Sequence, residues 1–479
     1  MLQLMKLDGS IGDFDTDRLA ESIDGRLVTK GHPDYDSLRS IWNAMIDRRP
    51  GLIIEASTEA DVIKAVNYAR ENSILIAVRA GGHNIAGTAL CNDGIVLDLQ
   101  QLKRIDVNSK EHIVKVEPGI SLGELDKATQ AHGLAVPTGI NSTTGISGLT
   151  LGGGFGWTTR KYGLTIDNLR SARIVTPAGE ILTVSDESHS DIFWAIRGGG
   201  GNFGVVTEFE FNLNLVGPEV FAGLVVHPFD EARSIIKQYQ TALSQVSEEL
   251  TCWLVLRQAP PLPFLPEEWH GKKVLILAMC YLGPVEKAEA DTKPLRAIGN
   301  PIAEGVGPMS FLDWQSAFDP LLTEGARNYW KSHDVEQFND SAIDTVIDAI
   351  EKLPSEECEV FFGHVGGAMT RHAASETPWP NRKAHFAINV HARWQKPSDD
   401  NRCVDWARDF FTALEPYAMG STYVNFMPEG DNNLVASAYG ENYDRLSKLK
   451  QEIDPDNLFR SNQNITPLLA GNAAAKTDV

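Results

Sequence analysis

The chain has 479 residues, of which 42% are hydrophobic and 22% charged, and its formal net charge is −21. Such a strongly acidic chain repels nucleic-acid phosphates and anionic lipid, so we expect neither nucleic acid nor a membrane as a partner. Residues 1–17 lack the basic and apolar segments of a signal peptide, and no apolar stretch of about 18 residues occurs, which predicts a cytoplasmic protein. The five scattered cysteines predict reduced thiols and no metal site.

The first half of the chain alternates between strand and helix patterns. Residues 52–54 favour a strand, and Thr58 with Asp61 forms the capping pattern of a helix with Val62, Val66 and Ala69 along one face. A second apolar run, residues 74–78, predicts a buried strand that leads into a glycine-rich loop.

That loop, residues 78–87, carries most of the functional information in the chain. Its sequence is Val-Arg-Ala-Gly-Gly-His-Asn-Ile-Ala-Gly, with the cation of Arg79 and the imidazole of His83. Glycines allow backbone N–H groups to approach an anion such as a pyrophosphate. A histidine in such a loop is exposed enough to act as a nucleophile toward a cofactor, although a plain turn with a polar histidine has the same pattern.

Two further glycine clusters follow in the cofactor half. A strand at 113–116 and a helix that begins with the capping box of Ser121 and Glu124, and ends at Gly133, precede them. The clusters occupy residues 149–157 and 197–204, and the second contains a G-x-G-x-x-G pattern. Residues 205–211 alternate like a strand, so the helix that a Rossmann fingerprint requires is missing, and we expect glycine loops that join strands of a non-Rossmann sheet.

The character of the sequence changes after residue 218. Strand-like runs alternate with helical stretches, which favours an α+β sheet covered by helices on one face. The expected strands are 221–226, 251–257, 274–281, 359–364 and 385–392, and the expected helices are 230–246, 341–352 and 400–414.

Taken together, these segments resemble the FAD-linked oxidases of the vanillyl-alcohol oxidase and p-cresol methylhydroxylase superfamily, in its berberine-bridge-enzyme-like branch. The matching segments follow one order from about residue 45 to 466: 79–83, 148–156, 194–200, 423–425, 439–443 and 454–460. The resemblance implies a two-domain α+β protein with a PCMH-type FAD-binding fold. We expect the FAD domain in 1–215, a substrate domain with an antiparallel sheet covered by helices in 216–416, and a C-terminal return to the FAD domain in 417–479.

The resemblance also implies that FAD is bonded covalently to His83. Bicovalent relatives carry a second link through a cysteine where this chain has Asn141, so a single histidyl linkage is expected. Thr144 falls where relatives control access of O2 to the flavin. The expected cofactor-binding residues are His83, Arg79, Ala80, Gly81, Gly82, Asn84, Gly87, Asn141, Thr144, Gly145, Gly148, Gly153, Gly154, Gly156, Gly204, Val206 and Asn425.

Four residues are the candidates for catalysis. Tyr423 and Asn425 match an element beside the flavin in the family, and we expect them on one face of a short strand, with cross-strand packing as the alternative role for the tyrosine. Lys331 matches a lysine that faces the flavin in several relatives, and a solvated charge is its alternative. His391 shares a sheet face with Asn389, which is either the flavin face or a solvent face.

The resemblance therefore implies an FAD-dependent oxidase of a small organic substrate. Hydride would leave a C–H bond next to O or N, and O2 would reoxidise the flavin to give H2O2. The substrate could be a secondary metabolite, an alcohol, a sugar or an N-heterocycle, and the protein a monomer or a homodimer. The alternatives are a dehydrogenase with another electron acceptor and a flavin-binding protein with an idle site.

Overall fold

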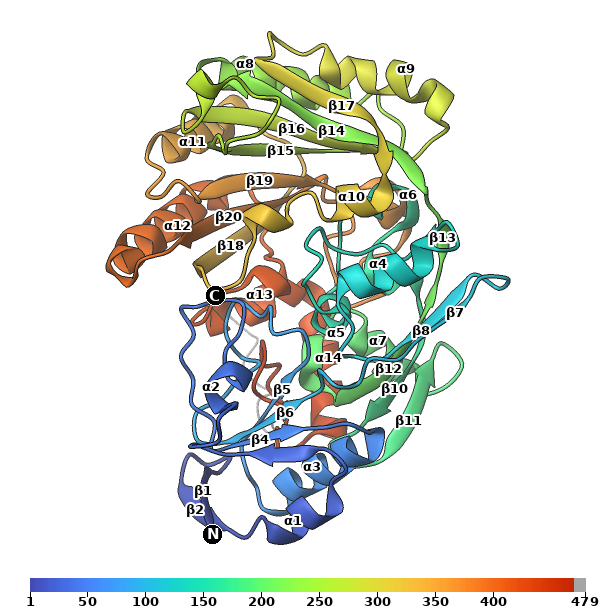
Figure 1. The fold of residues 1–479 in the computed structure, drawn as a ribbon, viewed down its shortest axis with the longest axis vertical. Helices are drawn as coiled ribbons and strands as arrows, with labels where there is room; N and C mark the ends of the chain where they lie inside the picture. Colours follow the sequence, from blue (N-terminus) through green and yellow to red (C-terminus); the bar gives the residue numbers. More distant parts are fainter. Residues whose placement is uncertain (469–479) are drawn as a thin grey trace, which may run out of the picture.

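The computed structural model describes residues 1–468, so residues 469–479 of the expected C-terminal return lie outside the described part. Strands of the cofactor half fill the lower part of Figure 1, and one large sheet fills the upper part. Within the described residues, no helix combines the length and the apolar character needed to cross a bilayer.

The N-terminal sheet has four strands in the order β3-β4-β6-β5, with β4 and β5 both parallel to β6. Helix α3 (Glu59–Glu71) begins with the predicted capping box between Thr58 and Asp61. Strand β5 delivers the chain into the loop of His83. The bounds are β3 (Arg26–Val28), β4 (Leu52–Glu55), β5 (Ile76–Arg79) and β6 (Ile95–Asp98).

A second, antiparallel sheet of five strands has the order β11-β10-β12-β8-β7. The capping box of Ser121 and Glu124 begins helix α4, as predicted. The two glycine clusters do not join strand to strand as expected. The cluster at residues 149–157 overlaps helix α5, and the cluster at residues 197–204 follows helix α7. The bounds are β7 (Ile105–Asn108), β8 (Ile113–Val116), α4 (Leu122–Gln130), α5 (Ile146–Leu151), β10 (Leu169–Val175), β11 (Ile181–Ser185), α7 (Ser190–Ile196) and β12 (Val205–Asn212).

The third large sheet has seven strands, all antiparallel, in the order β17-β14-β16-β15-β19-β20-β18. Two of them, β17 and β18, were not predicted. The strands are β14 (Glu219–Pro228), β15 (Leu250–Gln258), β16 (Lys273–Tyr281), β17 (Ala303–Ser310), β18 (Arg327–Val335), β19 (Glu359–His364) and β20 (Phe386–Trp394).

Four helices cover one face of this sheet, which is the α+β arrangement that the sequence predicted (Figure 1). The opposite face contributes Trp253, Ala278 and Ala387 to the same hydrophobic core as the glycine segments of the cofactor half. The sheet therefore presents this second face to the cofactor half. The helices are α8 (Ala232–Leu243), α9 (Val285–Arg296), α11 (Asp340–Glu351) and α12 (Asp400–Leu414).

The chain after α12 returns to the cofactor half. Helices α13 (Val435–Tyr439) and α14 (Tyr443–Ile453) pack there, and Ser461 forms a bridge beside Ala77 of β5. The expected strand at Tyr423 is wrong: Tyr423 caps a 3-10 turn, η9 (Val424–Phe426).

Candidate active site

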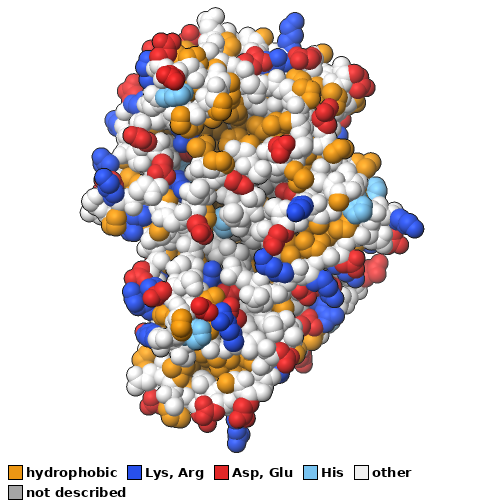
Figure 2. All heavy atoms as spheres, in the orientation of Figure 1, with side chains coloured by type: hydrophobic (Ala, Val, Ile, Leu, Met, Phe, Trp, Pro, Cys, Tyr) orange, Lys and Arg blue, Asp and Glu red, His pale blue; other side chains and the backbone are white. Residues whose placement is uncertain are grey.

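A cavity of about 340 Å³ lies between the glycine loops and the inner face of the seven-stranded sheet. Figure 2 shows a hollow on this side of the molecule with hydrophobic side chains along its upper edge. The cavity lining includes Gly201 and Phe459 of the cofactor half as well as Val255 and Ile276 of the seven-stranded sheet. It therefore extends from the cofactor loops into the substrate sheet.

His83 lies in the cavity wall, half-buried, with its ring stacked on Trp42 at a centroid distance of 5.1 Å. Its Nε2 is 2.8 Å from the Thr143 hydroxyl oxygen, and its Nδ1 is 3.4 Å from that of Thr144. Burial lowers the pKa of His83 to about 4. The imidazole is therefore neutral at physiological pH, which is the form that can act as a nucleophile.

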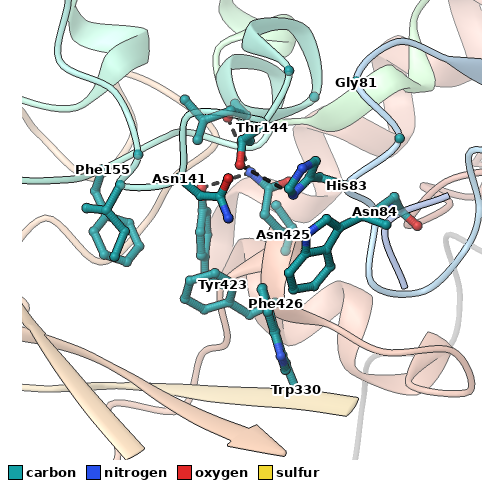
Figure 3. A pocket seen from close by; sticks show the side chains of 18 of the residues that line it. Gly81, His83, Asn84, Asn141, Thr144, Phe155, Trp330, Tyr423, Asn425 and Phe426 are labelled. Atoms are coloured by element: carbon teal, nitrogen blue, oxygen red, sulfur yellow. Dashed lines mark hydrogen bonds between the residues drawn. The ribbon is translucent and has the colours of Figure 1, made fainter. Parts of the chain in front are cut away.

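Asn141 fixes the orientation of the residues beside His83 (Figure 3). Its Nδ2 donates to the Leu322 carbonyl at 3.2 Å, so its Oδ1 faces the Thr143 backbone N–H at 3.0 Å. The same Oδ1 is 2.7 Å from the Thr143 hydroxyl, which donates to it. The Thr143 oxygen is then left to accept a hydrogen bond from the Nε2–H of His83. This chain of bonds favours the tautomer in which Nε2 carries the hydrogen and Nδ1 carries the lone pair, with the Thr144 hydroxyl as its 3.4 Å neighbour.

The predicted cofactor residues fall into two groups. Gly148 lines the cavity, and a Cβ there would meet nothing within 4 Å, so bare backbone faces the open space. Gly81 and Gly145 approach so closely that a Cβ on Gly81 would lie 2.4 Å from the Gly145 Cα. The predicted residues that line the cavity are Ala80, Gly81, Gly82, His83, Asn84, Asn141, Thr144, Gly145, Gly148, Gly204, Val206 and Asn425.

The remaining predicted glycines act behind the wall and do not line it. A Cβ at Gly153 would collide with the Trp379 ring, and one at Gly156 with the Thr138 carbonyl. Gly87, with φ of +71°, packs against Ile46 in the same way. These positions need glycine because other parts of the protein approach the backbone there.

Arg79 does not face the cavity, contrary to the prediction of a cation beside the pyrophosphate. Its Nη1 lies 3.4 Å from Asp98, the residue paired with it on the parallel strand β6, and also contacts the Leu38 carbonyl. The charge of this buried guanidinium is thus balanced within the sheet. Its role in the described structure is to brace the start of the His83 loop.

Tyr423 and Asn425 lie together in the cavity wall despite the absence of a strand. The Tyr423 hydroxyl oxygen accepts the backbone N–H of Gly154 at 3.1 Å and the Nδ2 of Asn425 at 2.8 Å. Among the described residues, none accepts the proton of this hydroxyl. Burial raises the pKa of Tyr423 to about 12, although both donors act in the opposite direction.

The Lys331 side chain does not line the cavity, contrary to the expectation that it faces the flavin. Strand β18 directs Trp330 and Ser332 to the cavity face and Lys331 to the helix-covered face, because neighbouring strand residues point to opposite sides. There the Lys331 ammonium lies 2.6 Å from Asp431 and 4.2 Å from the centre of the Phe411 ring.

His391 faces the cavity and does not lie on a solvent face. It belongs to a row of residues that crosses four adjacent strands. Arg257 of β15 pairs with Glu359 of β19, Glu359 pairs with His391 of β20, and His391 pairs with Trp330 of β18. Glu359 accepts from Arg257 at 2.5 Å and lies 3.2 Å from Nδ1 of His391. Burial would raise the pKa of Glu359, but Arg257 and His391 hold it at about 2.

Sequence reasoning missed most of the cavity residues that lie outside the glycine clusters. Arg257 and Glu359 carry charges within alternating strands, a pattern that usually indicates a solvent face. Trp42 precedes every motif that we singled out. The other missed lining residues include Ile140, Ser147, Leu149, Trp253, Trp330, Phe361, Phe426, Tyr439, Ser461, Asn462 and Gln463.

Comparisons with known proteins agree on the family of this protein. Residues 50–185 match the family described as FAD binding domain, and residues 422–466 match the one described as berberine and berberine like. An FAD-linked oxidoreductase of Dictyostelium discoideum is 32% identical over 94% of this chain and 96% of its own. The chain belongs to this berberine-bridge-enzyme-like family of FAD-linked oxidoreductases.

Two further relatives are both named as oxidases of 6-hydroxynicotine. The (R)-6-hydroxynicotine oxidase of Paenarthrobacter nicotinovorans is 29% identical over 93% of this chain and 97% of its own. The crystal structure of 6-hydroxy-D-nicotine oxidase from Arthrobacter nicotinovorans superimposes with a TM-score of 0.84 at 28% identity, over 93% of this chain and 99% of the other.

The residues present fit an FAD. Gly148 and Gly201 both line the cavity with no atom within 4 Å of a Cβ built on either, so backbone is open to a ligand at two separated places. The neutral imidazole of His83 lies on the same wall, and apolar and aromatic side chains supply a surface for a planar ring system.

Proposed function

We propose that this protein is an oxidase that holds FAD through a single covalent bond to His83. The observation that carries the proposal is the geometry of His83: a neutral ring on the cavity wall, stacked on Trp42, with Nε2 bonded to Thr143. Because Thr143 donates to Asn141 and accepts from Nε2 of His83, the ring nitrogen that carries the lone pair is Nδ1, whose hydrogen-bond neighbour is the Thr144 hydroxyl at a long 3.4 Å. We therefore assign the flavin bond to Nδ1.

Asn141 accounts for the single linkage. An amide cannot form a thioether, and all five cysteines are buried and unpaired in the described structure. Asn141 instead positions Thr143, and through it His83. We assign it the role of a positioning residue, and Ala80, Gly81, Gly82, Asn84, Thr144, Gly145, Gly148, Gly204 and Val206 the role of cofactor contacts.

Bound FAD would accept a hydride from a C–H bond next to O or N and pass two electrons to O2, giving H2O2. The chain's own contribution is the handling of the substrate proton. Tyr423 receives two N–H donors, and both stabilise negative charge on its oxygen. We assign Tyr423 as the group that takes the proton, with Asn425 holding it in place.

His391 is the second candidate for this role. It faces the same cavity, but its nitrogens already contact Glu359 at 3.2 Å and Asn328 at 3.3 Å. Burial lowers its pKa, and Glu359 acts against that shift. Because both ring nitrogens of His391 contact protein oxygens, neither is left to bind the substrate proton, and His391 ranks second.

Two observations test the proposal. Acid-precipitated holoenzyme should remain yellow, and the tryptic peptide that contains His83 should carry the mass of a flavin nucleotide. Anaerobic addition of a substrate should bleach the flavin, and admission of air should restore the colour with release of H2O2. A flavin that no alcohol, amine or sugar bleaches supports the idle-site alternative, and a bleached flavin that air does not restore supports a dehydrogenase.

A further inference from the structure

The half of the cavity that belongs to the seven-stranded sheet has a distinct pattern of side chains. Its floor is apolar: Trp253 and Phe361 lie with their ring planes only 8° apart at a centroid distance of 5.3 Å. Leu224, Val255, Ile276 and Ala278 complete the floor from neighbouring strands.

The side chains that adjoin this floor are also apolar. Phe155 and Trp157, from the glycine segment after α5, contact Trp253 at 5.8 and 4.6 Å. Phe318 and Leu322, from the segment between β17 and β18, line the cavity beside them. Because these rings pack directly against Trp253, a ligand in this half of the cavity lies beside one continuous aromatic and aliphatic surface.

One charged pair interrupts this surface. The Arg257 side chain is 9% exposed and that of Glu359 is 11% exposed, and both line the cavity. Arg257 uses Nη1 for Glu359 and Nε for the Gln258 carbonyl. Its Nη2 makes no hydrogen bond with any residue in the described part of the chain and is not among the fully enclosed atoms. This nitrogen is available to a ligand.

The charge of the pair decides which ligand group suits that nitrogen. Glu359 already neutralises Arg257, and both Glu359 oxygens are engaged, one by Arg257 and one by His391. An anionic ligand would lose its hydration in an apolar cavity without meeting an uncompensated cation. A sugar would bury several hydroxyl donors where no carboxylate oxygen is free. An uncharged carbonyl or ether oxygen needs only the one donor that Nη2 offers.

We propose that the substrate is a flat, uncharged, largely apolar aromatic compound whose carbonyl or ether oxygen is bound by Nη2 of Arg257. The proposal rests on the proposed oxidase function, because the aromatic ring must then lie with its reacting carbon toward the flavin side of the cavity. It assigns Arg257 as a specificity-determining residue and Glu359 as the residue that positions it.

Three matched probes test this subsite on the holoenzyme: 2-acetylnaphthalene, 2-ethylnaphthalene and 2-naphthoate. Binding is measured from the change in the flavin absorbance spectrum, which requires no turnover. The ketone should bind at least about tenfold more tightly than either of the others, since one hydrogen bond to a charged donor has that effect. Cellobiose should bind more weakly than all three.

Two variants locate the effect. Arg257→Lys keeps the charge beside Glu359 but removes Nη2, and should abolish the preference for the ketone. Arg393→Lys is the matched control, because Arg393 is buried in the adjacent part of the sheet but does not line the cavity. Flavin content and melting temperature verify that both variants fold.

Three results would overturn the inference: carboxylate binding as tight as ketone binding, a ketone preference that persists in Arg257→Lys, or a loss of preference in the Arg393 variant as well. Failure of the proposed function looks different. A protein that carries no flavin refutes the oxidase, and the same titrations are then read from quenching of the cavity tryptophans.

Discussion

Replacement of Tyr423 by phenylalanine removes one oxygen from the cavity wall and tests the assigned proton acceptor. The variant keeps the ring contacts with Phe155 and Trp379, at 5.3 and 4.8 Å. The lost oxygen leaves the Gly154 N–H and one of the two Asn425 amide N–H groups without an acceptor, while the amide still donates to the Leu149 carbonyl. The free energy of unfolding should fall by about 1–3 kcal/mol. Flavin reduction should slow by roughly 10²–10⁴-fold.

The pH dependence gives a sharper test than the rate alone. With a pKa of about 12 for Tyr423, only about one molecule in 10⁴ carries the phenolate at pH 8. The rate of anaerobic flavin reduction should therefore rise roughly tenfold per pH unit in the wild type and be flat in Tyr423→Phe. Because folding raises this pKa, the associated stability is present below pH 10 and is lost as pH rises toward 12, so rates are measured below that range.

Tyr439→Phe is the matched control for this experiment. Tyr439 is also a buried tyrosine that lines the cavity, and burial raises its pKa as well, but its hydroxyl has no hydrogen-bond partner among the described residues. It should retain the wild-type slope. A wild-type reduction rate that does not change with pH, or a Tyr423→Phe variant that reduces its flavin at the wild-type rate, would refute the assignment and favour His391.

Four other predictions concern the cofactor and the corrected lysine. His83→Ala should yield a colourless acid precipitate while native protein still binds FAD, because the glycine loops remain. Covalent attachment in the wild type should proceed at one rate from about pH 6 to 8, since His83 with a pKa of about 4 is neutral throughout; a strong rise across that range would contradict the value. Asn141→Cys should add a cysteinyl-flavin adduct on digest mapping, and Asn141→Ala should slow attachment at His83 because Thr143 loses its acceptor. Lys331→Met should lower the free energy of unfolding by up to roughly 3–5 kcal/mol and leave the pH profile of flavin reduction unchanged; an altered profile would reconnect Lys331 with the active site.

Local patterns in the sequence predicted those elements whose signals lie within a few residues. The capping boxes at Thr58 and Ser121 correctly located the beginnings of α3 and α4. The strand that follows the glycine cluster at residues 197–204 was also predicted correctly. A Rossmann fingerprint requires a helix at that place, so the strand excluded a Rossmann fold. Strand β18 was missed because most of its residues are polar and its two large aromatic residues, Tyr329 and Trp330, are adjacent, so no strand periodicity is visible. Its burial from both sides is a property of the assembled sheet.

The predictions for Arg79 and Lys331 failed for the same reason: the pairing of strands cannot be deduced from the local sequence. Arg79 looks like a phosphate-binding cation until β5 and β6 are aligned, and the alignment places Asp98 opposite it. Lys331 looks like an active-site cation until β18 is recognised as a strand, and the strand then sends it to the face opposite Trp330. A residue carried over from a resemblance keeps its position in the chain, whereas its direction depends on neighbours that are distant in sequence.

The same reasoning explains why the most informative substrate residues were invisible in the sequence. Arg257 and Glu359 are 102 residues apart, and each alone indicates a solvated charge on a strand. Antiparallel pairing of β15 with β19 places them opposite one another, and pairing of β19 with β20 adds His391. Because Glu359 contacts both Arg257 and His391, the sheet buries all three beside an apolar floor without leaving an unpaired charge. The cavity consequently offers a hydrogen-bond donor without a net charge, and this distinction between polarity and charge is what the matched ketone and carboxylate probes measure.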